Sequence, residues 1–310
     1  MIRAPTGFLL LAVAGPLAAQ PRQEFTELHM GVAVRLVLHA EDSAAARGAA
    51  RAAFQRIAAL EQVFSDYRAG SEVRQLAVRA GPDGRTPVSQ ELFTVLAAAR
   101  QVAEVTGGAF DPTIAPLVAL WRESRRSGRL PESARVDSAR SLVDWRLLEL
   151  DSARRTVRFG RPGMQLDLGG IAKGYILGQA LGVLRQHGAA AALIEAGGDI
   201  VLGDPPPGRD GWDIGLDGSD PGPLSGVAIA TSGTGEQFVE IGGVRYAHLV
   251  DPRTGLGLTH PAQVTIIGPD PAVADALATA LAVLGPGAES GILAAFPGYR
   301  AVITHRSLPP

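Results

Sequence analysis

The chain has 310 residues, of which 46% are hydrophobic and 19% are charged, and its formal net charge at pH 7 is −2. This composition excludes a generally disordered chain, and the length allows one large domain or two modest ones. The near-neutral charge argues against a nucleic-acid-binding protein, because such a protein normally carries a basic face.

The first 19 residues have the three-part pattern of an export signal. Arg3 supplies a positive charge, residues 7–15 are apolar, and small residues precede a cleavage site near Ala19. The alternative to an export signal is a buried N-terminal helix or strand. A membrane span is not expected, because the apolar run is too short and Pro16 interrupts it. The chain has no cysteine, hence no lipoprotein anchor. We therefore expect residues 20–310 to form one soluble domain, periplasmic or otherwise exported, without a membrane span after cleavage.

The N-terminal half of this domain is predicted to be mostly helical. Residues 31–40 alternate in polarity and are rich in valine, which predicts a strand. Apolar residues at helical spacing behind Asp or Ser caps predict helices over residues 43–64, from 71 onward and over 89–105. Residues 110–113 are expected to form a rigid loop with an Asp-Pro turn, and residues 122–140 one short helix with exposed loops and no chemistry. Residues 147–159 are expected to form two strands.

The C-terminal half is predicted to be mostly strands. Helices are expected over residues 171–187 and 272–284, with a shorter helix after the second. Strands are expected over residues 191–196, 211–216, 226–233, 237–241, 244–250, 262–268 and 299–305. Because helices cluster early and strands late without regular alternation, we predict an α+β fold with a mostly antiparallel sheet, packed helices and a single compact unit.

The stretch "LDLGGIAKGY", residues 166–175, combines an aspartate, paired glycines and a lysine at the start of a predicted helix. It matches neither a Walker A loop nor a dinucleotide fingerprint. Gly169 and Gly170 would let the backbone approach a ligand, and Lys173 adds a positive charge at the helix N-terminus. The alternative is a tight turn in which Asp167, at the end of a predicted strand, caps the helix.

A carboxylate and a hydroxyl share one face of the last long predicted helix. Asp275 and Thr279 are four residues apart, and such oxygens suit a hard cation such as Mg²⁺. The alternative is an aspartate that interacts with the helix dipole beside a packed threonine.

Three other stretches carry side chains that could contact a ligand. His248 precedes Asp251 by three residues at a predicted strand end. The two could form an acid–base pair or a substrate clamp, or His248 could be a structural histidine. Phe110 would give the loop over residues 110–113 a flat wall for a planar ring, or the segment is a routine helix stop with an Asp-Pro turn. Thr231 and Ser232 end a strand and offer hydroxyl groups.

Together and in this order, these motifs resemble the ApbE family, the FAD:protein FMN transferases. The matching stretches run from about Met30 to Gly285, and they are "HMGVAVRL", "FSDYRAGSEV", "GGAFDPTIAPLVALW", "LDLGGIAKGY", "GGDI", "TSG", "HLVDPRTG" and "ADALATALAVLG". The resemblance implies a T-fold-like α+β unit that uses Mg²⁺ to cleave FAD. Members attach FMN through a phosphoester to a threonine or serine of a target flavoprotein, such as a subunit of an ion-pumping oxidoreductase, and release AMP.

The same resemblance assigns roles to individual residues. It implies that His248 is the base and that the metal is held by Asp275, Thr279 and the backbone carbonyl of Gly170. FAD contacts are implied for Met30, Tyr67, Ala109, Phe110, Asp111, Asp167, Lys173 and the backbone of Leu249. Two departures are expected to matter: Gly257 stands where the family often has a proline, which would loosen the loop beside His248, and Ala278 stands where some relatives have a further carboxylate.

Two other activities remain open from the sequence alone. One is a Mg²⁺-dependent FAD pyrophosphatase that uses water as the acceptor and gives FMN and AMP. The other is an exported protein that binds or carries FAD without chemistry. The metal motif and His248 argue against a pure carrier, and a solute-binding protein would explain none of the motifs.

Overall fold

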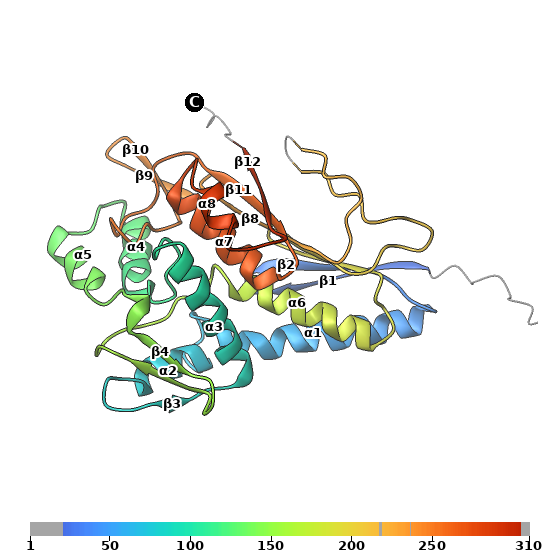
Figure 1. The fold of residues 1–310 in the computed structure, drawn as a ribbon, viewed down its shortest axis with the longest axis horizontal. Coiled ribbons are helices and arrows are strands. Elements are labelled where there is room, and N and C mark those ends of the chain that lie inside the picture. The colour runs from blue at the N-terminus through green and yellow to red at the C-terminus, as the bar shows by residue number, and fades with distance from the viewer. Residues whose placement is uncertain (1–20, 217–218, 236, 305–310) are drawn as a thin grey trace, which may run out of the picture.

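A computed structural model gives the fold and describes residues 21–216, 219–235 and 237–304. Its centre is a seven-stranded sheet in the order β1-β2-β6-β7-β8-β11-β12 (Figure 1). The strands are β1 (Arg22–His29), β2 (Val32–His39), β6 (Ala192–Ala196), β7 (Asp199–Leu202), β8 (Ala228–Gly233), β11 (Gln263–Gly268) and β12 (Arg300–Thr304). Every neighbouring pair is antiparallel. The prediction of an α+β fold with a mostly antiparallel sheet is therefore confirmed.

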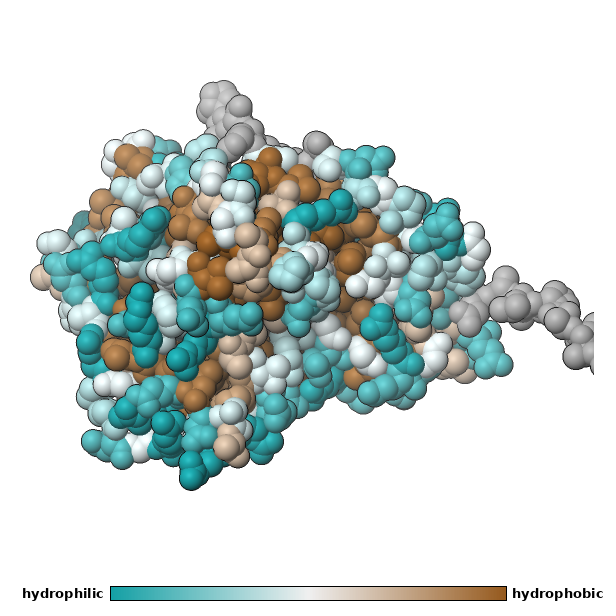
Figure 2. Space-filling view, in the orientation of Figure 1, coloured by the Kyte–Doolittle hydropathy of each residue, from teal (hydrophilic) through white to brown (hydrophobic). Residues whose placement is uncertain are grey.

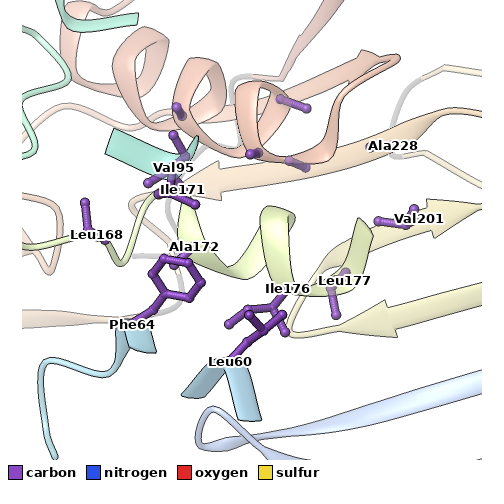
Figure 3. Packing of buried hydrophobic residues seen from close by; sticks show 14 of the residues in the cluster. Leu60, Phe64, Val95, Leu168, Ile171, Ala172, Ile176, Leu177, Val201 and Ala228 are labelled. Atoms are coloured by element: carbon purple, nitrogen blue, oxygen red, sulfur yellow. The ribbon is translucent and has the colours of Figure 1, made fainter. Parts of the chain in front are cut away.

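Helices cover one face of this sheet and bury the main core against it. They are α1 (Ser43–Phe64), α3 (Gln90–Val105), α6 (Ala172–Gln186) and α7 (Pro271–Leu284). Helix α6 packs against both α1 and α7, and α7 packs against β8 and β11. Figure 3 shows Ile176 and Leu177 of α6 among side chains from α1 and the sheet. The helix starts were predictable because the caps are local: Asp42 accepts hydrogen bonds from the first turn of α1, and Asp270 does so for α7.

A second group of elements lies beside the sheet, at the left of Figure 1. It contains α2 (Glu72–Arg79), β3 (Thr86–Pro87), α4 (Ala115–Ser127), α5 (Ser133–Arg140), the 3₁₀ turn η1 (Trp145–Leu147), β4 (Leu148–Asp151) and β5 (Thr156–Phe159). The hairpin of β9 (Phe238–Ile241) and β10 (Val244–Ala247) packs on α4 around Trp121, whose ring centroid is 5.5 Å from that of Tyr246. In Figure 2 the surface around α4 and α5 is largely hydrophilic, whereas hydrophobic residues gather near α7 and α8 (Glu289–Leu293).

The opposite face of the sheet is covered by residues 204–216 and 219–227. Trp212 is buried there against Val37, Leu193 and other sheet residues, and its backbone exchanges hydrogen bonds of 2.7 and 3.0 Å with Leu224. The predicted strand at 211–216 is therefore wrong. Its alternating apolar side chains pack on the sheet, and its backbone forms only isolated bridges within the covering segment instead of adding a strand.

Other predicted boundaries also differ from the structure. Residues 122–140 were expected to hold one short helix, but they contain the end of α4 and all of α5. Helix α4 begins earlier, at Ala115, because Leu117, Trp121 and Ser124 recur on one buried face. The residues before Asp167 form one isolated bridge, from Gln165 to Ile114, and not a strand. Strand β10 ends at Ala247 rather than at residue 250, and β1 and β7 were not predicted. The signal-peptide prediction falls on residues 1–19, outside the described residues, and no described helix is long and apolar enough to cross a membrane.

Candidate functional site

Two glycines of α6 allow its first turns to touch the start of α7. A Cβ atom on Gly174 would lie 2.0 Å from the carbonyl oxygen of Pro271, and one on Gly178 would lie 2.7 Å from the Pro271 ring. This approach lets the backbone N–H of Gly174 donate a hydrogen bond of 3.1 Å to Oδ2 of Asp275. The glycines of "AKGYILG" therefore serve helix packing as well as the turn before it.

Replacing Gly174 with alanine should force α6 and α7 apart and destabilise the fold by about 1–3 kcal/mol, because the added methyl meets backbone rather than a movable side chain. Gly182→Ala is the matched control: it lies in the same helix with no atom within 4 Å of the added Cβ. That substitution should stabilise the protein by about 0.5–1 kcal/mol. Chemical denaturation measures both, and equal stabilities would contradict the close contact.

Asp275 is a carboxylate in the interior, with only 4% of its surface exposed. Burial, followed by the nearby carboxylate of Asp199, raises the pKa of Asp275 to about 7, although Lys173 and the Gly174 N–H act in the opposite direction. A buried carboxylate that ionises so reluctantly is stabilised best by a bound cation.

The metal-free protein should lose stability as the pH rises from about 4 to about 7. The pKa of Asp275 is 3.8 in an ordinary environment and about 7 here, so the folded state holds a proton that the unfolded state has released across this range. Asp275→Asn should flatten this part of the profile. Thermal unfolding in metal-free buffer between pH 4 and pH 8 measures the effect, and a wild-type stability that rises across this range with the same slope as Asp275→Asn would contradict it.

Thr279 lies one turn after Asp275, and its hydroxyl meets two other segments. Its Oγ1 is 3.1 Å from Oγ of Ser232 at the end of β8. A Cβ atom on Gly170 would lie 2.8 Å from the same Oγ1, so the glycine turn passes beside it. The three predicted metal ligands thus converge. Among the described residues, no three His, Cys, Asp or Glu side chains gather as a metal site, so a cation here would need hydroxyl and carbonyl ligands as well.

Lys173, the only lysine of the sequence, forms an ion pair with Asp199. Burial lowers the pKa of Lys173, but the carboxylates of Asp275 and Asp199 outweigh this effect and raise it overall. Asp199 is 2% exposed, its Oδ1 accepts a hydrogen bond of 3.1 Å from the backbone of Thr231, and burial raises its pKa against the pull of Lys173. Sequence reasoning noted "GGDI" but did not assign Asp199. The feature that could have identified Asp199 in the sequence is a carboxylate next to an otherwise apolar strand.

Asp167 lies in the glycine turn and joins a second charged cluster. Its Oδ1 accepts a hydrogen bond of 2.8 Å from the backbone of Gly169, and burial, with the nearby charge of Asp66, raises its pKa. Arg122 of α4 places Nη2 3.4 Å from Oδ2 of Asp167 and 2.5 Å from Oδ2 of Asp66. The same guanidinium lies 4.6 Å from the centroid of the Tyr67 ring. Arg122 was not predicted as a site residue, because residues 122–140 contain no recognisable motif.

Met30 occupies the turn between β1 and β2 in a left-handed conformation, with φ of 53°. Its backbone N–H donates a hydrogen bond of 2.6 Å to Oε1 of Glu61, whose Oε2 is 3.3 Å from Nδ1 of His29. A non-glycine residue pays a conformational penalty at this φ, so Glu61 fixes the turn that presents Met30. Glu61 was not predicted, because its partner lies on a different element.

The loop before α4 is more closed than predicted. Ala109 and Phe110 are each 5% exposed, so the expected flat aromatic wall at Phe110 is instead packed into the core. The carboxylate of Asp111 accepts hydrogen bonds from Thr113 N and Oγ1 and from Trp145 N. Its side chain therefore holds the loop together, and its backbone remains the part that could contact a ligand.

His248 and Leu249 follow β10. The backbone N–H of His248 donates a hydrogen bond of 2.9 Å to the carbonyl oxygen of Gln237. The carbonyl oxygen of Leu249 accepts one of 2.9 Å from the backbone N–H of Leu258. Asp251 is bound by the guanidinium of Arg253, with Oδ2 2.8 Å from Nη2. The Asp251 carboxylate therefore helps to fold the turn at residues 251–255.

The expectation that Gly257 loosens this loop is wrong. A Cβ atom on Gly257 would lie 2.4 Å from the Trp121 indole, and Trp121 Nε1 donates a hydrogen bond of 2.8 Å to Ala247 O. The indole occupies the space of any larger side chain at this position, and it fixes the strand end that leads to His248.

Comparison with known proteins decides the family. The sequence model of the ApbE family matches residues 30–303. The chain belongs to the ApbE family. It is 33% identical over 299 residues to the FAD:protein FMN transferase of Treponema pallidum (strain Nichols), covering 89% of this chain and 82% of the relative. It is 34% identical over 280 residues to that of Klebsiella pneumoniae (strain 342), covering 87% and 84%.

The fold agrees with solved ApbE structures. The crystal structure of the ApbE protein of Thermotoga maritima superposes with a TM-score of 0.79 at 30% identity, covering 91% of this chain and 94% of that one. The resemblance read from the motifs and the predicted ApbE fold are confirmed. The transferase names of the relatives bear out the expectation of an enzyme.

Proposed function

We propose that this ApbE protein transfers FMN from FAD to a threonine or serine hydroxyl of a target protein. In this reaction the acceptor oxygen forms a new bond to the FMN phosphorus, the bond from that phosphorus to the bridging oxygen breaks, and AMP leaves with the bridging oxygen. The observation that carries the proposal is the buried carboxylate of Asp275 beside Thr279, Lys173 and the glycine turn. The names of its relatives supply the substrate class.

The donors around Asp275 fit Mg²⁺, which prefers oxygen ligands and keeps part of its coordination for water and phosphate. Asp275, the Thr279 hydroxyl and the Gly170 carbonyl would hold it, and Ala278 supplies no further ligand. When bound, Mg²⁺ would neutralise the charge of the pyrophosphate. Asp199 holds Lys173 at the start of α6, where its charge also faces Asp275. Ser232 would orient the Thr279 hydroxyl.

His248 is proposed to accept the proton of the acceptor hydroxyl. His248→Ala should therefore slow transfer by about 100-fold or more, with a much smaller effect on FAD affinity. His187→Ala, at the exposed end of α6, is the control and should change neither quantity. AMP release and FAD titration measure the two effects separately. Loss of FAD binding together with activity would assign His248 to binding instead.

The test of the function is incubation of the mature protein with FAD and Mg²⁺, with and without a threonine-containing acceptor domain. We expect AMP in the presence of the acceptor, and an acceptor mass increased by FMN in a phosphoester. AMP and free FMN without this adduct, whatever acceptor is supplied, would favour the pyrophosphatase. Bound FAD without AMP would favour a carrier.

We also propose that the protein is exported and acts on an exported target. The support is the three-part pattern of residues 1–19. Mass spectrometry of the N-terminus, after expression in a bacterium with a periplasm, should find a chain that begins near Gln20. A cytoplasmic chain that retains Met1 would contradict export.

A further inference from the structure

Tyr67 is an aromatic residue with an exposed ring. About 80% of its surface faces solvent, although it lies in the connection between α1 and α2, close to the glycine turn through Arg122. The guanidinium of Arg122 lies 4.6 Å from the ring centroid. One face of the ring is therefore held by a cation, and the opposite face is open to a ligand.

Arg122 joins three segments that are distant in sequence. From α4, its Nη2 lies 2.5 Å from Oδ2 of Asp66, which precedes Tyr67, and 3.4 Å from Oδ2 of Asp167 in the glycine turn. Both carboxylates are largely buried, with 20% and 12% of their side chains exposed. The guanidinium thus fixes the aromatic ring relative to the Asp167 carboxylate, and through the turn relative to Gly170.

A purely structural tether would not need this arrangement. A partly exposed ion pair stabilises a fold by about 0–1 kcal/mol, and it needs no exposed tyrosine ring beside it to do so. An ordered, exposed ring beside a buried carboxylate is what a planar heteroaromatic ligand requires, since stacking on a fixed ring avoids the entropy loss of ordering a mobile one. Arginine suits this role better than lysine, because a planar guanidinium can stack on a ring and contact two carboxylates at once.

We propose that Arg122 is a positioning residue for the substrate: it holds Tyr67 as a platform on which a heteroaromatic ring of the dinucleotide stacks, and it holds Asp167 beside that platform. The inference rests on the proposed function and adds to it a residue outside the family motifs that match this chain. Arg122 acts through Tyr67 and Asp167, so it should affect binding of the ring much more than the chemical step.

The test is titration of metal-free protein with FAD, followed by flavin fluorescence, so that binding is measured without turnover. Arg122→Met should weaken FAD binding by about tenfold or more and reduce the quenching of the bound flavin, which a stacked ring enhances. Arg122→Lys should recover part of the affinity. Arg126→Met, exposed one turn further along α4, is the matched control and should bind within about twofold of wild type. In turnover, Arg122→Met should raise KM and leave kcat within about threefold.

A double variant separates positioning from general loss of structure. Tyr67→Ala removes an exposed ring and should not unfold the protein, but it should weaken FAD binding as Arg122→Met does. Because Arg122 acts largely through Tyr67, the double variant should bind FAD within about threefold of Arg122→Met alone. Fully additive losses, or an Arg122→Met variant that binds FAD as wild type does, would overturn the inference. A wild-type protein that binds no FAD would overturn the proposed function with it.

Discussion

Replacing Asp275 with alanine is expected to abolish Mg²⁺-dependent release of AMP from FAD, lowering the rate by about 100- to 1,000-fold. Asp275 is the only charged ligand in the proposed set, since Thr279 offers a hydroxyl and Gly170 a carbonyl. Without it, the remaining neutral oxygens would hold Mg²⁺ weakly, and the pyrophosphate would react without its counter-charge. The measurement is AMP release with FAD and acceptor over a range of Mg²⁺ concentrations.

Asp275→Asn distinguishes this loss from unfolding. Its side-chain oxygen can still accept the hydrogen bond from Gly174, and removal of a buried charge should leave the metal-free protein at least as stable as wild type near pH 7. Mg²⁺ should raise the unfolding temperature of the wild type but not of this variant, because a ligand stabilises only a state that it binds. An Asp275→Ala enzyme with undiminished Mg²⁺-dependent activity would refute the site.

The second large effect is expected at the ion pair of Lys173 and Asp199. Lys173→Met or Asp199→Asn alone should lower the free energy of unfolding by about 3–5 kcal/mol, because each leaves a buried charge without its partner. The Asp275 carboxylate makes the loss of Lys173 the more severe of the two. The double variant should recover much of the stability, since it buries neither charge. Urea denaturation of both single variants and the double variant measures the coupling.

An exposed pair supplies the control. Arg209 and Asp213 are 2.8 Å apart, and both side chains are more than half exposed. Arg209→Met should change the free energy of unfolding by less than about 1 kcal/mol. If the single variants of the buried pair were no less stable than Arg209→Met, then solvent or another group would be compensating for the lost partner.

The helices were predictable because their signals are local. Asp42, Ser71 and Ser89 cap α1, α2 and α3 as their positions in the sequence indicate. The predicted strand at 211–216 failed for a tertiary reason, since Trp212 is used to cover the sheet rather than to join it. The start of α4 was not predicted, because its polar Arg-rich end conceals the buried face formed by Leu117 and Trp121.

The residues of the candidate site also fall into those that the sequence predicts and those that it does not. Asp275 and Thr279 were recognisable because they share one helical face, and Lys173 because it follows the glycine turn. Their partners Asp199 and Ser232 could not be placed from the sequence, because β7 and β8 become neighbours of α6 and α7 only when the sheet has formed. Arg122 and Glu61 contact their partners across separate elements, which no spacing in the sequence encodes.

The order of the site residues along the chain also determines when the candidate site can form. Lys173 emerges first during synthesis, then Asp199 and Ser232, and Asp275 comes last on α7. This helix packs across β8 and β11, so the proposed metal site is complete only after contacts form between segments far apart in the chain, and such contacts form slowly. A chain interrupted before Pro271 would lack Asp275 and Thr279, both side-chain ligands of the proposed metal site. The proposed transfer of FMN should therefore begin only after the C-terminal part has folded onto the rest of the chain.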